Sequence, residues 1–335
     1  MKRTMSTVVV SILVMTTLAI GRPASKQLSI IDLGTLPGGS NSLAKDINKR
    51  GQVVGSSFTS SGELHAFLWE GGTMIDLGTL PGRTNSFAEA INDRGQVVGA
   101  SEGISILFHA FLWEDGTMID LGTLPGGTIS FANDINKRGQ VVGTSATALS
   151  AAHPFLWEGG TMIDLGTLPG GTGGNAQAIN DRGQVVGGAN TATDALHAFL
   201  WEDGTMIDLG TLPGGNFSQA LDINNRGQVV GVSITGSGEF HAFLWEGGTM
   251  IDLGTLPGGI GSRARGINDR GQIVGGGGTA LGAAHAFLWE NGTIIDLGTL
   301  PGGHGSFAEA INDRGQVVGT SDTASDAHAV LWTKR

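Results

Sequence analysis

A strict internal repeat constrains the fold of this chain more than any other feature. The aspartate of an Asp-Leu-Gly motif recurs seven times at intervals of 44 residues, at Asp32, Asp76, Asp120, Asp164, Asp208, Asp252 and Asp296. A fixed period of this length indicates an array in which each unit buries its apolar surface against its neighbours. We therefore interpret the repeats of this 335-residue chain as one array rather than as two domains.

Each repeat contains a hairpin that turns on a glycine pair or a close substitute. The segment 65–82 reads HAFLWEGGTMIDLGTLPG, and later copies replace Gly-Gly with Asp-Gly or Asn-Gly. These pairs are typical of a type I′ turn, which needs positive φ at both central residues. Centring the turn on Gly71 and Gly72 places His65 opposite Gly78. Both faces of the hairpin are largely apolar, so we expect both to be covered.

A second hairpin in each repeat surrounds an Asn-Asp-Arg-Gly turn. Asparagine in the first position and glycine in the fourth are typical of a type I turn. Together the hairpins predict four strands per repeat, which we name A to D and which fall in the second repeat at 86–91, 96–101, 109–114 and 117–122. The repeats show no helical periodicity, so the sequence predicts an all-β array.

Four short strands per unit, apolar on both faces and repeated seven times, predict a seven-bladed β-propeller. A β-solenoid is the alternative, but it normally uses shorter rungs and needs end caps that we do not find. The repeats begin with an orphan strand D at 28–34 and stop after a strand C at 327–335. We expect these two strands to pair and close the ring, within a single domain that spans 26–335.

Residues 1–25 stand outside the repeats and are typical of a secretory signal peptide. Lys2 and Arg3 precede an apolar run over 8–20, and small residues follow up to Ser25. The run is short for a bilayer span; an uncleaved N-terminal anchor is the alternative. We expect a monomer that is secreted, extracellular or periplasmic, without membrane insertion once the signal is removed.

Charge and cysteine content narrow the range of partners. The chain has 19 Lys+Arg and 30 Asp+Glu, a net charge of −11 at pH 7, and no cysteine. An acidic surface repels polyphosphate, so we do not expect nucleic acid as a partner. Without disulfides, stability must come from packing. We expect an extracellular ligand, either a glycan or a protein, and no cofactor.

The repeat motifs also carry a family resemblance. His-Ala-Phe in strand C, preceded by INDRGQVVG and followed by DLGTLPGG, resembles the HAF family of bacterial extracellular repeat proteins. The resemblance covers about 28–333 and departs from the pattern at Pro154 and Val330. It implies export and a repeat fold, and it implies no catalytic residue.

The histidines and aspartates raise the question of an enzyme. His65 is expected diagonal to Asp76 across the hairpin, either as an acid/base pair or as a hydrogen bond that fixes the strands. The pair recurs in every repeat, whereas catalysis needs one site, so we favour the structural role and expect no catalytic residue. Lys49 and Lys137 replace the turn aspartate, so we expect no calcium loop and no metal site. The tryptophan that ends strand C, Trp69 in the first repeat, is expected between blades rather than as a sugar platform.

Differences between the repeats point to one end of the propeller. The A–B and C–D turns are nearly constant and lie at one end of each blade, whereas the B–C and D–A connections lie at the other. The B–C connections vary widely, from polar at 56–64 to apolar at 100–108. Binding sites commonly use loops on a rigid scaffold, so we expect binding at this end; drift of unconstrained loops is the alternative.

The second residue of the predicted strand A changes character in three consecutive repeats. It is apolar in four repeats, but it is Asn175, Gln219 and Arg263 in the other three. Gln177 and Arg265 lie two residues further along the same face. We predict that these five polar residues bind the ligand; drift at a solvated strand end is the alternative.

Two classes of function remain open from the sequence. We favour a secreted, non-catalytic binding or interaction scaffold. The alternative is an extracellular hydrolase or lyase that acts on a glycan with loop carboxylates such as Glu63, Glu102 or Glu239 over the central channel. Two carboxylates about 5 to 10 Å apart would favour the enzyme.

Overall fold

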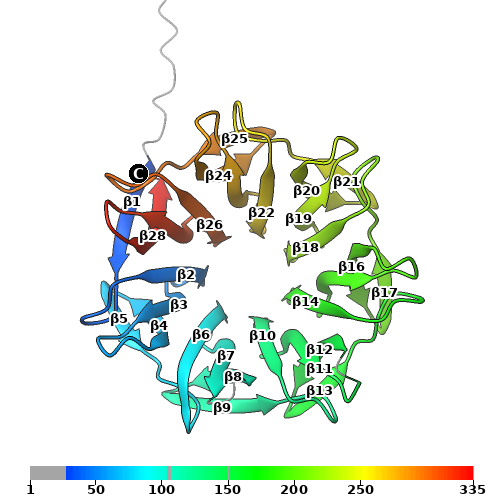
Figure 1. Ribbon diagram of the computed structural model, residues 1–335, viewed down its shortest axis with the longest axis horizontal. Coiled ribbons are helices and arrows are strands. Elements are labelled where there is room, and N and C mark those ends of the chain that lie inside the picture. The colour runs from blue at the N-terminus through cyan, green and yellow to red at the C-terminus, as the bar shows by residue number, and fades with distance from the viewer. Residues whose placement is uncertain (1–27, 104–106, 150, 335) are drawn as a thin grey trace, which may run out of the picture.

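The computed structural model describes residues 28–103, 107–149 and 151–334. In these residues the chain forms 28 strands in seven four-stranded antiparallel sheets, which surround a central axis (Figure 1). The described residues contain no helix. The protein is therefore the seven-bladed β-propeller that the sequence predicts. The expected signal peptide, residues 1–25, lies outside the described residues.

Strand A of each blade lies nearest the axis and strand B follows it outward (Figure 1). The A strands are β2 (Ser42–Ile47), β6 (Arg83–Ile91), β10 (Ser130–Ile135), β14 (Gly174–Ile179), β18 (Ser218–Ile223), β22 (Ser262–Ile267) and β26 (Ser306–Ile311). The B strands are β3 (Val53–Phe58), β7 (Val97–Gly103), β11 (Val141–Ala146), β15 (Val185–Asn190), β19 (Val229–Ile234), β23 (Ile273–Gly278) and β27 (Val317–Asp322). We number the blades one to seven in this order.

Strands C and D form the outer half of each blade. The C strands are β4 (Leu64–Glu70), β8 (Phe108–Glu114), β12 (Ala152–Glu158), β16 (Leu196–Glu202), β20 (Phe240–Glu246), β24 (Ala284–Glu290) and β28 (Ala327–Lys334). The D strands are β5 (Thr73–Asp76), β9 (Thr117–Gly122), β13 (Thr161–Asp164), β17 (Thr205–Asp208), β21 (Thr249–Asp252), β25 (Thr293–Asp296) and β1 (Leu28–Gly34).

The two ends of the chain close the ring, as predicted. Strand β1 pairs antiparallel with β28, with Ile30 opposite Trp332 and Asp32 opposite Val330 (Figure 1). Blade seven therefore contains three strands from the C-terminal end and one from the N-terminal end. Blade seven thus has four strands like the other blades, and the edge of β28 is covered by β1 rather than open to intermolecular pairing.

The C–D hairpins show the predicted turn and most of the predicted register. Gly71 and Gly72 have φ of 58° and 91°, as a type I′ turn requires. The expected pairing of His65 with Gly78 is wrong, because strand D bulges one residue earlier. In blade two the bulge is visible as a register shift that places Gly122 opposite an alanine, Ala110, rather than opposite the preceding histidine.

Apolar side chains fill the space between blades. In the first interface, Val54 and Leu68 of blade one pack with Ile91 and Phe111 of blade two. Strand C is covered on both faces, as predicted. Strand D is not: Ile75 remains 43% exposed, because the outermost strand has a neighbour on only one side in its sheet. The tryptophans pack against this core but are partly buried, apart from Trp332, which is 1% exposed.

A serine that opens strand A joins most neighbouring blades. Ser86 accepts a hydrogen bond from Ala66 N (2.8 Å) and donates one to Gly78 O (2.6 Å), both in the preceding blade. The interface between blades three and four differs, because Pro154 has no N–H and Gly174 stands in place of the serine. The departure from His-Ala-Phe at Pro154 is thus matched by the loss of its acceptor.

Candidate functional site

The two ends of the central channel have different chemistry. We call the end with the A–B and C–D turns the turn end, and the end with the B–C and D–A connections the variable end. The structure has a cavity at each, of about 190 Å³ at the turn end and about 800 Å³ at the variable end.

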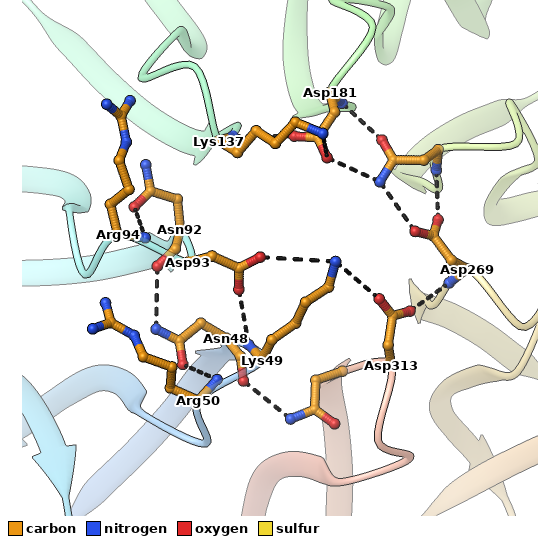
Figure 2. Close-up of polar contacts among 12 residues, drawn as sticks. Asn48, Lys49, Arg50, Asn92, Asp93, Arg94, Lys137, Asp181, Asp269 and Asp313 are labelled. Carbon is orange, nitrogen blue, oxygen red and sulfur yellow. Dashed lines mark hydrogen bonds and ion pairs between the residues drawn. The ribbon is translucent and has the colours of Figure 1, made fainter.

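A closed ring of asparagines organises the turn end. Nδ2 of Asn48 donates to the carbonyl oxygen of Asn92 (3.1 Å), and the pattern continues around the ring until Asn312 donates to Asn48 (3.0 Å) (Figure 2). Oδ1 of Asn48 accepts the N–H groups of Arg50 and Gln52. The constant Asn-x-Arg-Gly-Gln motif is therefore explained by hydrogen bonds that hold the blades together.

The next turn residue adds a ring of six charged side chains and one asparagine, part of which Figure 2 labels. Its members are Lys49, Asp93, Lys137, Asp181, Asn225, Asp269 and Asp313. Nζ of Lys49 lies 3.1 Å from Asp313 and 3.8 Å from Asp93, and the hydrogen bond to Asp313 raises the pKa of Lys49. Among the described residues, no group of three or more His, Cys, Asp or Glu side chains is placed to hold a metal ion.

Three aspartates beneath this ring clamp the blades in pairs. Oδ1 of Asp46 accepts the N–H of Ile47 (2.7 Å), and Oδ2 accepts that of Ile91 in the next blade (2.9 Å). Asp134 and Asp222 join blades three to four and five to six in the same way. The clamps therefore recur every second blade.

Burial of these three carboxyl groups is the main cause of their altered acidity. It raises the pKa of Asp46 to about 6 and that of Asp222 to about 7, and it raises the pKa of Asp134 well above the usual value. Hydrogen bonds from the isoleucine N–H groups oppose the shift, and repulsion between the aspartates adds to it.

The larger cavity, at the variable end, lies across blades two, three and four. It exists because small residues occupy positions that are larger in other blades. Ala152 opens strand C where blades one and four have Leu64 and Leu196, and Gly174 opens strand A where the other six blades have serine. The 800 Å³ volume lies within the range of small-molecule sites.

Phenylalanines form one wall of this cavity. The ring of Phe108 lies between those of Phe87 and Phe131, with centroid distances of 6.1 and 4.9 Å. These residues come from strands β8, β6 and β10, so two neighbouring blades support the wall. Phe131 keeps 36% of its surface exposed, and Leu149 at the rim keeps 91%.

Polar side chains lie two residues beyond the phenylalanines on the same A strands. The carboxylate of Glu89 lies 3.3 Å from Nζ of Lys45, which neutralises it. Nδ2 of Asn133 donates to the carbonyl of Ala176 (2.7 Å). The side chains of Asn133 and Glu89 thus belong both to the cavity and to contacts with a neighbouring blade.

The structure brings together two of the five predicted site residues. Asn175 and Gln177 line the cavity, and Nε2 of Gln177 donates to Oδ1 of Asn175 (3.2 Å). Gln219, Arg263 and Arg265 lie outside it. Arg265 pairs with Glu309 at 3.6 Å. The side chain of Arg263 is partly exposed. Its pKa is lowered, chiefly because part of the side chain is buried and secondly because the positive charge of Arg265 is near.

Sequence reasoning missed the aromatic half of this site. Phe87 and Phe131 follow the majority pattern of apolar residues at the second position of strand A. The B–C connection that ends at Phe108 is apolar, but its sequence does not indicate that the ring lies beside those two phenylalanines. The small residues at 151–152 and 173–174, in consecutive blades, were the signal that a hollow forms there.

The predicted histidine–aspartate hydrogen bond is present in every blade. Nδ1 of His65 lies 2.9 Å from the Asp76 carboxylate, which also accepts the N–H of Gly78 (2.7 Å). In blade seven, His328 makes the same contact with Asp32 across the chain ends (2.8 Å). The pair holds the bulge in strand D beside strand C, in agreement with the structural role.

The loop carboxylates that an enzyme would need are dispersed. Glu63 accepts hydrogen bonds from Ser61 and Thr59 in its own loop, and these lower its pKa. The pKa of Glu239 is lowered in the same way, chiefly by Ser237. Glu102 accepts a hydrogen bond from Asn85 (2.8 Å). None of the three glutamates lines the large cavity.

The chain matches no protein-family profile and no curated protein sequence. The resemblance to HAF repeats therefore stays a prediction. Within the described ranges, no helix has the length and hydropathy of a membrane span.

Solved β-propeller structures do resemble this one. The β-propeller domain of the Trilobed protease from Pyrococcus furiosus has 11% identity and a TM-score of 0.58, over 89% of this chain and 95% of that one. A puromycin-hydrolyzing peptidase from Mycobacterium tuberculosis has 13% identity and a TM-score of 0.53, over 84% of this chain and 49% of that one. Identities this low show a common fold and no common activity. By fold, the chain is a seven-bladed β-propeller.

Proposed function

We propose that the protein is a secreted, non-catalytic scaffold that binds an extracellular ligand at its variable end. The observation that carries this proposal is the cavity of about 800 Å³ across blades two to four. Strands of three blades hold its walls, so the site needs little ordering when a ligand enters. The turn end offers only about 190 Å³, and its polar side chains are engaged in joining the blades.

The placement of carboxylates favours binding over glycan hydrolysis. Such hydrolysis generally needs two carboxyl groups on opposite sides of one bond, one of them with a raised pKa. The described lining of the large cavity contains a single carboxylate, Glu89, and Lys45 pairs with it. The lowered pKa values of Glu63 and Glu239 are opposite to what a general acid needs.

Gln219, Arg263 and Arg265 extend the proposed binding surface beyond the cavity. They continue the strand A positions of Asn175 and Gln177 into blades five and six. The two arginines share one carboxylate, Glu309, so this sector carries excess positive charge on an acidic protein. The side chain of Arg263 reaches solvent in part, and its guanidinium offers several donors in a fixed plane.

A screen that reads binding and cleavage on the same material tests this proposal. The mature protein would be exposed to immobilised neutral and acidic polysaccharides and to a peptide library, with product analysis of each. We expect retention without cleavage. Thr172→Trp, at the cavity rim, should abolish retention, whereas Arg94→Ala, at the exposed turn end, should leave it unchanged. Cleavage products, no retention at all, or loss only with Arg94→Ala would contradict the proposal.

Export is part of the same proposal and has its own test. The N-terminal sequence and the resemblance to extracellular HAF repeats support it. When the full chain is expressed in a bacterium, the exported fraction should begin near residue 26 by N-terminal sequencing. Full-length protein retained in the cytoplasm would contradict the proposed export.

A further inference from the structure

The single charge in the described lining of the large cavity is compensated by an ion pair. Glu89 is the one charged residue of this lining, and the ion pair with Lys45 at 3.3 Å compensates it. The arginines of blade six are not part of the lining. A charged ligand would lose hydration on entering and find no opposite charge there, so the cavity favours a neutral occupant.

The amides of the cavity retain hydrogen-bonding capacity. Asn133 and Gln177 each use the amide nitrogen in a contact, and Asn175 uses its oxygen. Within the described part of the chain, Oδ1 of Asn133, Oε1 of Gln177 and Nδ2 of Asn175 have no hydrogen-bond partner. These three residues line the same cavity and keep two acceptors and one donor, and a hydroxyl group can donate to the former and accept from the latter.

Aromatic and partly exposed surface lies next to these amides. Phe87, Phe108 and Phe131 line the same cavity, and Phe131 is two residues from Asn133 in β10. A pyranose ring has one face of C–H groups and a rim of hydroxyls, so it matches a cavity lined by both aromatic rings and amides. A purely apolar ligand would leave the amides without partners once water is displaced.

We propose that this cavity binds a neutral carbohydrate, with sugar rings against Phe108 and Phe131 and hydroxyls on Asn133, Asn175 and Gln177. This inference rests on the proposed binding function and names its ligand class. It assigns recognition to blades two to four. The arginines of blade six lie beyond the cavity and contribute only to a ligand that extends past it.

Pairs of oligosaccharides that share a backbone and differ in charge test this proposal. Calorimetric titration of the mature protein would compare N-acetylated chitohexaose with its deacetylated, cationic form, and methyl-esterified with free oligogalacturonate. Cellohexaose and mannohexaose complete the neutral set. We expect at least one neutral compound to bind, at least tenfold more tightly than any charged counterpart.

Variants with matched controls locate the site. Phe108→Ala should weaken binding at least tenfold, whereas Phe240→Ala, the same position in blade five and 45% exposed, should not. Ala152→Leu fills the cavity with the residue that blades one and four carry there, and it should also abolish binding. Ala284→Leu in blade six is its control. Thermal melting of each variant separates lost binding from lost folding.

The outcomes distinguish this inference from the function on which it rests. Preference for a charged sugar, or unchanged affinity in both Phe108→Ala and Ala152→Leu, would overturn it. Retention of a peptide or an acidic polymer at the variable end, with no neutral sugar bound, would overturn it and leave the scaffold function intact. A protein that cleaves its carbohydrate, or retains nothing in the wider screen, would contradict both.

Discussion

At the residue scale, Asp46, Asp134 and Asp222 link acidity to the assembly of blades. Each carboxylate accepts N–H groups from two blades while it is largely removed from water. Burial raises the pKa values, so the folded protein holds these protons more tightly than the unfolded chain does. Stability is thereby coupled to pH at the centre of the molecule.

The first prediction concerns this coupling. The carboxyl groups contribute stability that is fully present below about pH 4, their usual pKa, and lost as pH rises through about 6 for Asp46 and about 7 for Asp222. We expect the free energy of unfolding to fall across that window, by about 1.4 kcal/mol per unit of pKa shift as an upper bound. Denaturant titrations at pH 4.5 and 8 measure it.

Replacing all three aspartates by asparagine removes the three titrating carboxyl groups, so this triple variant can be compared with the parent protein. The triple variant should lose the slope of stability with pH. Asp203→Asn is a suitable control, because that exposed turn position is Asn291 in blade six. A slope that persists in the triple variant would show that other groups cause it.

The second prediction concerns the arginines outside the large cavity. If the bound ligand extends to blade six, Arg263→Ala or Arg265→Ala should each cost about 1.5 to 3 kcal/mol of binding free energy, the usual cost of a charge-assisted hydrogen bond. Arg94→Ala, on the exposed turn end, is the matched control. Titration of the ligand found in the screen decides the matter: unchanged affinity in both variants would remove these arginines from the site.

At the element scale, the blades are held by a few side chains at fixed positions on each strand. At most interfaces the first serine of strand A makes the same two hydrogen bonds to the preceding blade. It accepts one from a backbone N–H and donates one to a backbone carbonyl. The interface between blades three and four does without it. The cavity lies at that interface, where Gly174 also leaves room.

The third prediction tests the serine link. Ser86→Ala leaves the N–H of Ala66 and the carbonyl of Gly78 without that partner in a buried place, at a cost of roughly 1 to 3 kcal/mol in the free energy of unfolding. Ser60→Ala, at an exposed loop position, should change it by less than about 0.5 kcal/mol. Equal effects of the two substitutions would show that the link contributes little.

Much of this element structure was predictable because local rules determine it. Gly71 and Gly72 specify a type I′ turn, and the turn fixes the pairing of the adjacent strands. The register further from the turn was wrong, because the bulge in strand D depends on a side chain: the carboxylate of Asp76 accepts the N–H of Gly78. A count of residues from the turn does not include such a contact.

The candidate site was only partly predictable, because its two halves follow different patterns. Asn175 departs from a mainly apolar position of the repeat, and Gln177 lies two residues further along the same face. Phe87 and Phe131 followed the majority pattern, and only their contact with Phe108 makes them a wall. The pairing of blades was also missed, although the sequence shows it: Asp46, Asp134 and Asp222 are 88 residues apart.

At the scale of the whole molecule, contacts between the two ends of the chain close the ring. Blade seven is completed by β1, and Lys49 joins blade one to Asp313 of blade seven at the turn end. The hydrogen bond from Ala329 N to Ser42 (2.9 Å) continues the serine pattern across the same junction. The junction between the chain ends therefore has the contacts of an ordinary interface.

The fourth prediction follows from this closure. Deleting residues 28–34 removes β1, exposes the edge of β28 and should cause aggregation or a large loss of stability. Removing only residues 1–25 should leave the melting temperature unchanged. Size-exclusion chromatography and thermal melting measure the two effects, and a deletion variant that melts within a few degrees of the parent would refute the role of β1.

The paired aspartates have a consequence for the number of blades. Each clamp serves two blades, so three clamps satisfy six, and in blade seven the corresponding residue is Ala310, with Gly266 in the blade before it. Clamps that each join two blades can include every blade only when the number of blades is even. A ring of seven therefore leaves one blade without a clamp, and in this protein it is the blade that the two chain ends build together.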